Sequence, residues 1–189
     1  VRAFYRQCDN PAVQTEGSDT MIVYKTLNPV TAVVNNALCI GTSTGRITVT
    51  GPLAANIEYS INGGASWQAS PVFNNVAAGT YIVEARLVAS LCGGSTTAII
   101  TEPAILTSIA VPSSFATCPN NDGSIAITAG GGTAPYQYSI DNGISYQAGN
   151  VFSNLPAGNY NNIRVKDANG CISNAGAVIN LVDTMRLEL

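Results

Sequence analysis

The stretch YSINGGASWQASPVFNNVAAGTY (59–81) decides the fold, because it recurs farther along the chain as YSIDNGISYQAGNVFSNLPAGNY (138–160). The two copies align without a gap and are identical at 13 of 23 positions. Two pairs of cysteines, Cys39 with Cys92 and Cys118 with Cys171, have one internal spacing and are related by the same shift of 79 in residue number. A fixed period of this kind predicts a tandem array of units about 79 residues long.

The period sets the expected domain boundaries. Two complete units fit the chain, at 26–104 and at 105–183. We expect residues 1–25 to be the tail of a truncated preceding unit, and residues 184–189 to be the start of a following unit or a linker. An array interrupted in this way predicts a piece of a longer protein.

Within each unit, apolar and polar residues alternate over short stretches, as in RITVT (46–50) and SIAIT (124–128). Such stretches, bounded by Gly, Pro and Asn, are typical of strands, and no segment carries a helical stripe. The pattern predicts an all-β chain of tandem immunoglobulin-like antiparallel β-sandwich repeats. Asn161 and Asn162 indicate a bulge in one strand. The strands expected in the second unit are 106–111, 124–129, 136–140, 150–155, 160–166 and 172–180.

Composition argues against several classes of function. The chain has a net charge of −3 and eight scattered Lys and Arg residues, so no clustered surface is available for nucleic acid. No apolar run approaches the roughly 20 residues that cross a bilayer, and we expect no membrane insertion. Histidine is absent, which removes Ser-His-Asp and Cys-His catalysis and the usual zinc ligand sets. We expect no cofactor.

The cysteines predict disulfides. If the strands alternate in direction, the turns that carry Cys118 and Cys171 lie at the same end of a unit, which favours the pairs Cys39–Cys92 and Cys118–Cys171. Cys8 would then have lost its partner by truncation. Pairing Cys92 with Cys118 also respects the repeat, but it would have to span a strand of about 23 Å, whereas bridged Cα atoms lie about 6 Å apart. Paired cysteines indicate an oxidising, extracellular setting, and five buried thiols in a cytosolic protein are the alternative.

The sequences SINGGASWQ (60–68) and SIDNGISYQ (139–147) resemble the Asp-box of sialidases and related β-propellers. The Ser, the Asx and the Gly suit a tight hairpin in which the side chains cap backbone amides. When the units are aligned at the shift of 79, the arginines are not shared, since Arg86 is aligned with Val165. No acidic pair persists in both units, as glycosidase chemistry would require. We therefore expect a turn and a chain that is not an enzyme.

Two carboxylates are weak calcium candidates. Asp122 lies in CPNNDG (118–123) and Asp167 in KDANG (166–170), both close to cysteines. Calcium takes six to eight oxygen ligands, and the first unit has no carboxylate at the same places. We expect turn-forming residues there and no metal site.

Trp67 and Tyr146 occupy equivalent positions in the two units. Exposed aromatic rings stack on sugars or proteins, so these two residues are candidates for ligand stacking. The alternative is that each ring packs against its own turn. A carbohydrate-binding array predicts that both rings are exposed.

Taken together, GGTAPYQYSIDNGISYQ (131–147), VFSNLPAGNY (151–160) and VKDANGC (165–171) resemble the SprB-type repeat of Bacteroidota cell-surface proteins. The first unit departs from that pattern at GPLAANIEY (51–59) and at RLVASLC (86–92). The resemblance implies large filamentous adhesins that move along the cell surface during gliding and are exported by the type IX secretion system. It carries over no catalytic residue.

We therefore expect a structural or adhesive region of an extracellular, cell-surface adhesin or filament. Its expected partners are neighbouring repeats of the same chain, with surface glycans or another extracellular protein as further candidates. Three alternatives stay open. They are a carbohydrate-binding array, accessory repeats of a secreted hydrolase, and a self-assembling filament subunit in which Cys8 pairs between chains. The sequence identifies neither the ligand nor the length of the parent protein.

Overall fold

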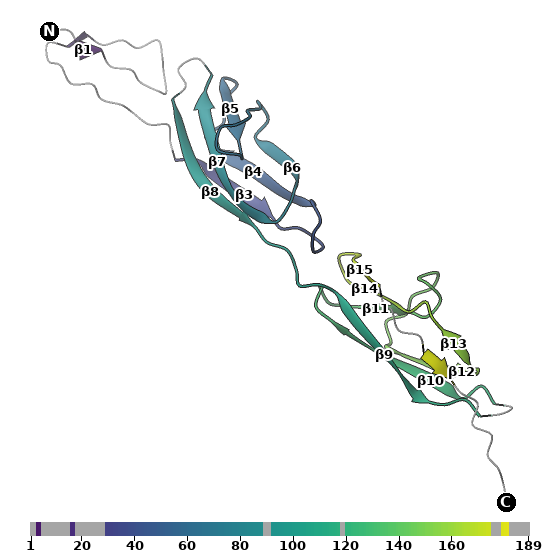
Figure 1. Ribbon diagram of the computed structural model, residues 1–189. Coiled ribbons are helices and arrows are strands. Elements are labelled where there is room, and N and C mark those ends of the chain that lie inside the picture. The colour runs from purple at the N-terminus through teal and green to yellow at the C-terminus, as the bar shows by residue number, and fades with distance from the viewer. Residues whose placement is uncertain are drawn as a thin grey trace, which may run out of the picture. The chain divides into compact units, whose positions relative to one another are not determined.

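The structure is a computed structural model, and all its regular elements are β-strands within the residues it describes (Figure 1). The described residues are 3–4, 16–17, 29–88, 92–117, 120–174 and 179–181. Contacts divide the chain into two compact units. The first comprises Val1–Ala37 and Gly41–Glu102, and the second comprises Leu38–Ile40 and Pro103–Leu189.

The first unit contains two three-stranded antiparallel sheets, in the orders β3-β4-β6 and β5-β7-β8, and the short pair β1-β2. Every sheet neighbour is antiparallel. The strands are β1 (Ala3–Phe4), β2 (Glu16–Gly17), β3 (Thr31–Asn35), β4 (Gly45–Gly51), β5 (Ile57–Ser60), β6 (Val72–Val76), β7 (Gly79–Leu87) and β8 (Gly93–Ile100).

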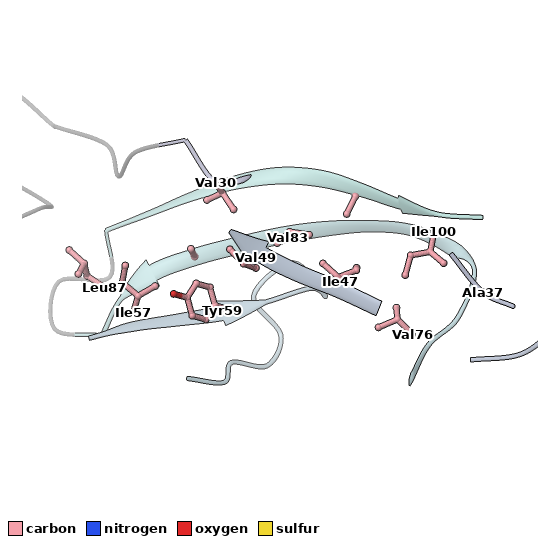
Figure 2. Close-up of a cluster of buried hydrophobic side chains, with 12 residues drawn as sticks. Val30, Ala37, Ile47, Val49, Ile57, Tyr59, Val76, Val83, Leu87 and Ile100 are labelled. Atoms are coloured by element: carbon pink, nitrogen blue, oxygen red, sulfur yellow. The ribbon is translucent and has the colours of Figure 1, made fainter. Parts of the chain in front are cut away.

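Side chains from both three-stranded sheets of the first unit meet in one buried cluster (Figure 2). In β4, Ile47 and Val49 are buried while the preceding Arg46 is exposed, as strand alternation requires. In β7, Val83 and Ala85 belong to the same cluster. Because the two sheets share one core, the unit is a β-sandwich.

The second unit has a similar arrangement of antiparallel sheets. Its sheets have the orders β12-β10-β9, β11-β14-β15 and β13-β16, and their pairings are antiparallel. Its core includes Ile125, Ile127, Ile163 and Val165. The strands are β9 (Thr107–Ser114), β10 (Gly123–Gly130), β11 (Gln137–Ser139), β12 (Val151–Leu155), β13 (Gly158–Tyr160), β14 (Arg164–Lys166), β15 (Ile172–Asn174) and β16 (Ile179–Leu181).

One extra residue interrupts the strand that corresponds to β7. Tyr81 is matched by Tyr160, at the shift of 79, but the parallel bridge of Asn62 to Ile82 is matched by a bridge of Asp141 to Asn162. Ile82 of the first unit therefore corresponds to Asn162 of the second, a difference of 80 in residue number. The difference between equivalent residues stays at 80 until the next turn. The strand is divided into β13 and β14 at the place where the two asparagines indicated a bulge.

A tyrosine fixes the entry to this strand in each unit. The hydroxyl of Tyr81 donates to the carbonyl of Ala77 at 2.9 Å, and that of Tyr160 donates to the carbonyl of Pro156 at 3.0 Å. A tyrosine that bonds back to the backbone at the start of this strand is the tyrosine corner of immunoglobulin-like sandwiches. The prediction of an all-β antiparallel fold is confirmed.

Candidate functional site

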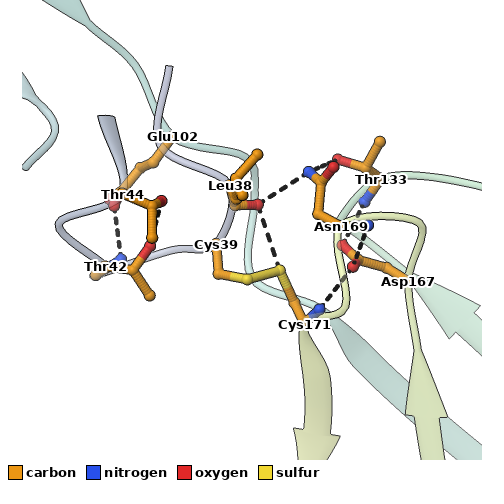
Figure 3. Close-up of a disulfide and its surroundings, with 10 residues drawn as sticks. Leu38, Cys39, Thr42, Thr44, Glu102, Thr133, Asp167, Asn169 and Cys171 are labelled. Carbon is orange, nitrogen blue, oxygen red and sulfur yellow. Dashed lines mark hydrogen bonds between the residues drawn. A yellow bond between two sulfur atoms is a disulfide. The ribbon is translucent and has the colours of Figure 1, made fainter. Parts of the chain in front are cut away.

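The structure joins Cys39 to Cys171, with 5.7 Å between their Cα atoms and a sequence separation of 132 (Figure 3). The predicted pairs Cys39–Cys92 and Cys118–Cys171 are therefore wrong. Cys92 is also disulfide-bonded. Cys8 and Cys118 lie outside the described residues.

The direction of β8 explains why the prediction failed. The N–H of Ala37 donates to the carbonyl of Thr101 at 2.9 Å, so the turn after β3 lies beside the end of β8. Cys92 instead precedes the start of β8. An eight-residue strand is about 25 Å long, far more than a disulfide spans. The Leu38–Ile40 segment groups with the second unit, where Cys171 lies.

Asp167 organises the turn that presents Cys171. Its carboxylate accepts hydrogen bonds from the N–H groups of Cys171 at 2.8 Å, Asn169 at 2.9 Å and Thr133 at 2.9 Å. The residue is only 4% exposed. A buried carboxylate is stable when several N–H groups satisfy it, so Asp167 is a structural centre of the turn.

Gly132 allows the preceding loop to close over this carboxylate. Its φ is +57°, and a Cβ atom built on it would lie 2.8 Å from Oδ2 of Asp167. The loop and the turn are also joined through the N–H of Ala168, which donates to the carbonyl of Thr133 at 2.9 Å. Only glycine fits this conformation and this approach without displacement.

The segment Leu38–Ile40 is held on this turn by a covalent bond and a polar contact (Figure 3). The side-chain amide of Asn169 donates to the carbonyl of Leu38 and to Oγ1 of Thr133, each at 3.0 Å. Sγ of Cys171 lies 3.3 Å from the same Leu38 carbonyl oxygen. A disulfide sulfur carries no proton, so this last approach is a van der Waals contact.

The disulfide borders an open groove of about 520 Å³ within the second unit. The walls are formed by residues 103–108, by Cys39 and Ile40, and by residues 171–173. Both cysteines are half-buried.

The Asp-box residues form turns, as predicted. In the first unit, Oγ of Ser60 accepts from the N–H groups of Asn62 and Gly64, and Oδ1 of Asn62 accepts from the N–H of Ser66 at 3.0 Å. In the second unit, Ser139 and Asp141 make the same contacts with the backbone of the turn. These oxygen atoms are engaged by the turn itself.

Asp141 differs from its counterpart Asn62 by its charge. Hydrogen bonds from the hydroxyl of Ser139 and from the hydroxyl and N–H of Ser145 hold the pKa of the Asp141 carboxyl well below its ordinary value. These donors favour the charged form of the carboxyl. In the first unit the amide of Asn62 donates to Oγ of Ser66 instead. The same turn is thus built with an acid or with an amide.

Each candidate stacking aromatic carries a cation over its ring. The guanidinium of Arg86 lies 3.8 Å from the centroid of Trp67, and the ammonium of Lys166 lies 4.2 Å from the centroid of Tyr146. Both rings are half-buried. Nε1 of Trp67 also donates to the carbonyl of Gly64 in its own turn. One face of each ring is therefore occupied by the protein.

This shared basic residue was missed by the ungapped alignment, which placed Arg86 against Val165. In the structure, Arg86 pairs with Glu58 across the sheet, and Lys166 pairs with Gln137, which matches Glu58 at the shift of 79. Arg86 and Lys166 are therefore equivalent. The signal was the one-residue insertion beside Asn162, which raises the shift between the units to 80.

The two calcium candidates are occupied by protein donors. Asp167 is enclosed by the N–H groups of its own turn, and Asp122 accepts from the N–H of Thr117 at 2.6 Å and from its hydroxyl at 2.7 Å. Those bonds hold the pKa of the Asp122 carboxyl below its ordinary value. Within the part of the chain that the structure describes, no group of three or more acidic, Cys or His residues could hold a metal ion.

Part of the chain matches a known protein family. The SprB repeat matches residues 116–144, a stretch that runs through β10, β11 and the first half of the Asp-box turn. The match supports an SprB-type repeat protein. No curated protein matches the chain. Over the described ranges, none of the elements is a helix with the length and apolar character needed to span a membrane.

Proposed function

We propose that this SprB-type chain is a non-catalytic structural and adhesive repeat region of a large extracellular cell-surface adhesin or filament, linked to surface attachment or gliding. The observation that carries the proposal is the SprB repeat at residues 116–144. SprB repeats occur in cell-surface proteins.

The physical character of the units supports a spacer role. Each unit has its own buried core between antiparallel sheets, so each can extend a chain without help from a ligand. The polar atoms of the Asp-box turns are engaged in holding those turns. The Cys39–Cys171 disulfide fits an oxidising, extracellular setting.

Immunogold electron microscopy of intact cells that produce the protein tests this proposal. Antibody raised against these 189 residues should label structures on the outer surface of unpermeabilised cells. Serum pre-adsorbed with the purified chain is the control. Label confined to culture fluid, or present only after permeabilisation, would contradict a cell-surface adhesin and favour a secreted protein or an intracellular one.

A further inference from the structure

We propose that the Cys39–Cys171 disulfide is a tension-bearing shortcut that diverts load from the backbone between these residues. The inference rests on the proposed role as a surface spacer, because only a chain under tension needs such a path. Its physical basis is the covalent connection of two residues whose sequence separation is 132.

The position of the bond in the chain determines what it shields. A force applied before Cys39 and after Cys171 passes through the S–S bond, because the enclosed backbone is slack relative to that shorter path. The enclosed residues include every strand from β4 to β14, and therefore the strands that carry most of both cores. Only β3 and the two strands β15 and β16 lie outside the closed loop among the described strands of the two sandwiches.

Disulfides within each repeat would behave differently. Bonds Cys39–Cys92 and Cys118–Cys171 would leave residues 92–118 in series with the load. That stretch contains β8 and β9, which pair with the central strands β7 and β10. Tension would then pull directly on β8 and β9. The observed pairing removes these strands from the force path.

The covalent bond anchors the Leu38–Ile40 segment to the turn that carries Cys171. The side chains of Leu38 and Ile40 are 48% and 45% exposed, so burial contributes little to holding the segment. The hydrogen bond from Asn169 to the carbonyl of Leu38 contributes a further, weaker attachment. At the other end, Cys171 is held by the buried carboxylate of Asp167. A force transmitted through Cys39 therefore acts on a turn whose backbone is hydrogen-bonded to Asp167.

The equivalent cysteine of the first unit is also bonded. Cys92 precedes Cys171 by the repeat shift of 79 and is also disulfide-bonded. Its partner is not Cys39, because Cys39 is bonded to Cys171. In both units, the cysteine of this turn is therefore not bonded to the partner that was predicted for it within its own repeat.

Disulfide mapping of the oxidised, full chain is the first test. After denaturation at low pH with thiols blocked, trypsin releases Cys39 in peptide 26–46 and Cys171 in peptide 167–186, while Cys92 and Cys118 share peptide 87–164. We expect peptide 26–46 linked to peptide 167–186 alone. Pairing within each repeat would instead link all three peptides into one species, and that result would overturn the proposal.

Force spectroscopy then tests the shortcut itself. The chain that keeps only Cys39 and Cys171 (C8S, C92S and C118S together) is compared with the all-serine chain, which also carries C39S and C171S. With handles at the chain ends, we expect the oxidised two-cysteine chain to extend about 450 Å less, since a sequence separation of 132 spans about 3.3–3.6 Å for each residue. Reduction should abolish the difference. The maximal extension depends on whether the disulfide closes the loop, so the comparison holds even if the all-serine chain does not fold.

The outcomes separate the inference from the proposed function. Equal extension of the two oxidised chains, or unfolding of the enclosed strands at the same force in both, would overturn the shortcut while leaving surface labelling unaffected. Absence of surface label with a confirmed shortcut would contradict the adhesin role alone.

Discussion

Asp167 and Cys171 are joined by two hydrogen bonds across one tight turn. The N–H of Cys171 donates to Oδ1 of Asp167 at 2.8 Å, and the N–H of Asp167 donates to the carbonyl of Cys171 at 3.0 Å. In the first unit, the N–H of Leu87 donates to the carbonyl of Cys92 at 2.9 Å, so the backbone of the turn is shared. The carboxylate belongs to the second unit alone.

Replacing this carboxylate should loosen the turn. We expect Asp167→Asn to destabilise the second unit by roughly 1.5–3 kcal/mol, because hydrogen bonds to a charged acceptor are lost and an amide presents N–H groups to N–H donors. Hydrogen exchange followed by mass spectrometry should show faster exchange in β14 and β15, with the first unit unchanged. Asp122→Asn is the control, since that carboxylate also accepts from a neighbour but is exposed. Equal exchange in Asp167→Asn and wild type would contradict the role of Asp167.

The cation over Trp67 can be tested through fluorescence, because the chain contains a single tryptophan. We expect Arg86→Gln to expose the indole and shift its emission to longer wavelength, with a stability loss of about 0.5–1 kcal/mol from the cation–π contact. Arg86 also forms an ion pair with Glu58, so Glu58→Gln separates the two contributions. Arg46→Gln, at an exposed position of β4, is the control. An unchanged emission spectrum in Arg86→Gln would show that the guanidinium does not cover the ring.

The charge of Asp141 predicts acid sensitivity of the second unit. Because the folded-state pKa is depressed, the carboxylate contributes stability that is fully present above the unfolded value of about 3.9 and is lost as the pH falls through the folded pKa. We expect the thermal midpoint of the second unit to fall on acidification below about pH 4. Asp141→Asn, which copies the amide of Asn62, should reduce that dependence.

The comparison has an internal control, because the first unit already carries Asn62 at this place. The depressed pKa of Asp122 supplies a second acid-sensitive carboxyl, so some dependence should persist in Asp141→Asn. Identical midpoint-against-pH curves for Asp141→Asn and wild type would rule out a contribution from Asp141.

The features that could be predicted from sequence are those set by near neighbours in the chain. Alternation in RITVT (46–50) placed Ile47 and Val49 in the core, and the Ser, Asx and Gly of the Asp-box determined their turns. Both depend on interactions within a short stretch, which the local sequence fully contains.

The disulfide could not be predicted in this way, because it depends on strand direction across the whole unit. β3 and β6 both run antiparallel to β4, so the strands do not simply alternate in direction along the chain. As a result, the end of β8 lies beside the turn after β3. No local pattern reports that relationship. The equivalence of Arg86 and Lys166 was missed because one residue is inserted beside Asn162. The shift between the units returns to 79 at the next turn, so the period of the cysteines does not reveal the insertion.

The period also predicts how a longer array is cross-linked. Cys118 lies outside the described residues, but it follows Cys39 by the repeat shift of 79. Extending residues 1–183 with a second copy of residues 105–183 supplies a further repeat, and we expect Cys118 to bond to the copy of Cys171 in it. Shortcuts would then overlap, so that each repeat lies within two closed loops except at the ends of the array.

Tryptic mapping of this extended chain distinguishes the pairings. The copy of Cys171 is released in a short C-terminal peptide that copies residues 167–183, and Cys118 is in peptide 87–164. These two peptides should be linked. A link from the C-terminal peptide to the junction peptide, which holds the copied Cys118, would mean that a repeat closes on itself. The Cys39–Cys171 pairing would then be particular to the first two units, because the equivalent cysteines of the following units would pair differently.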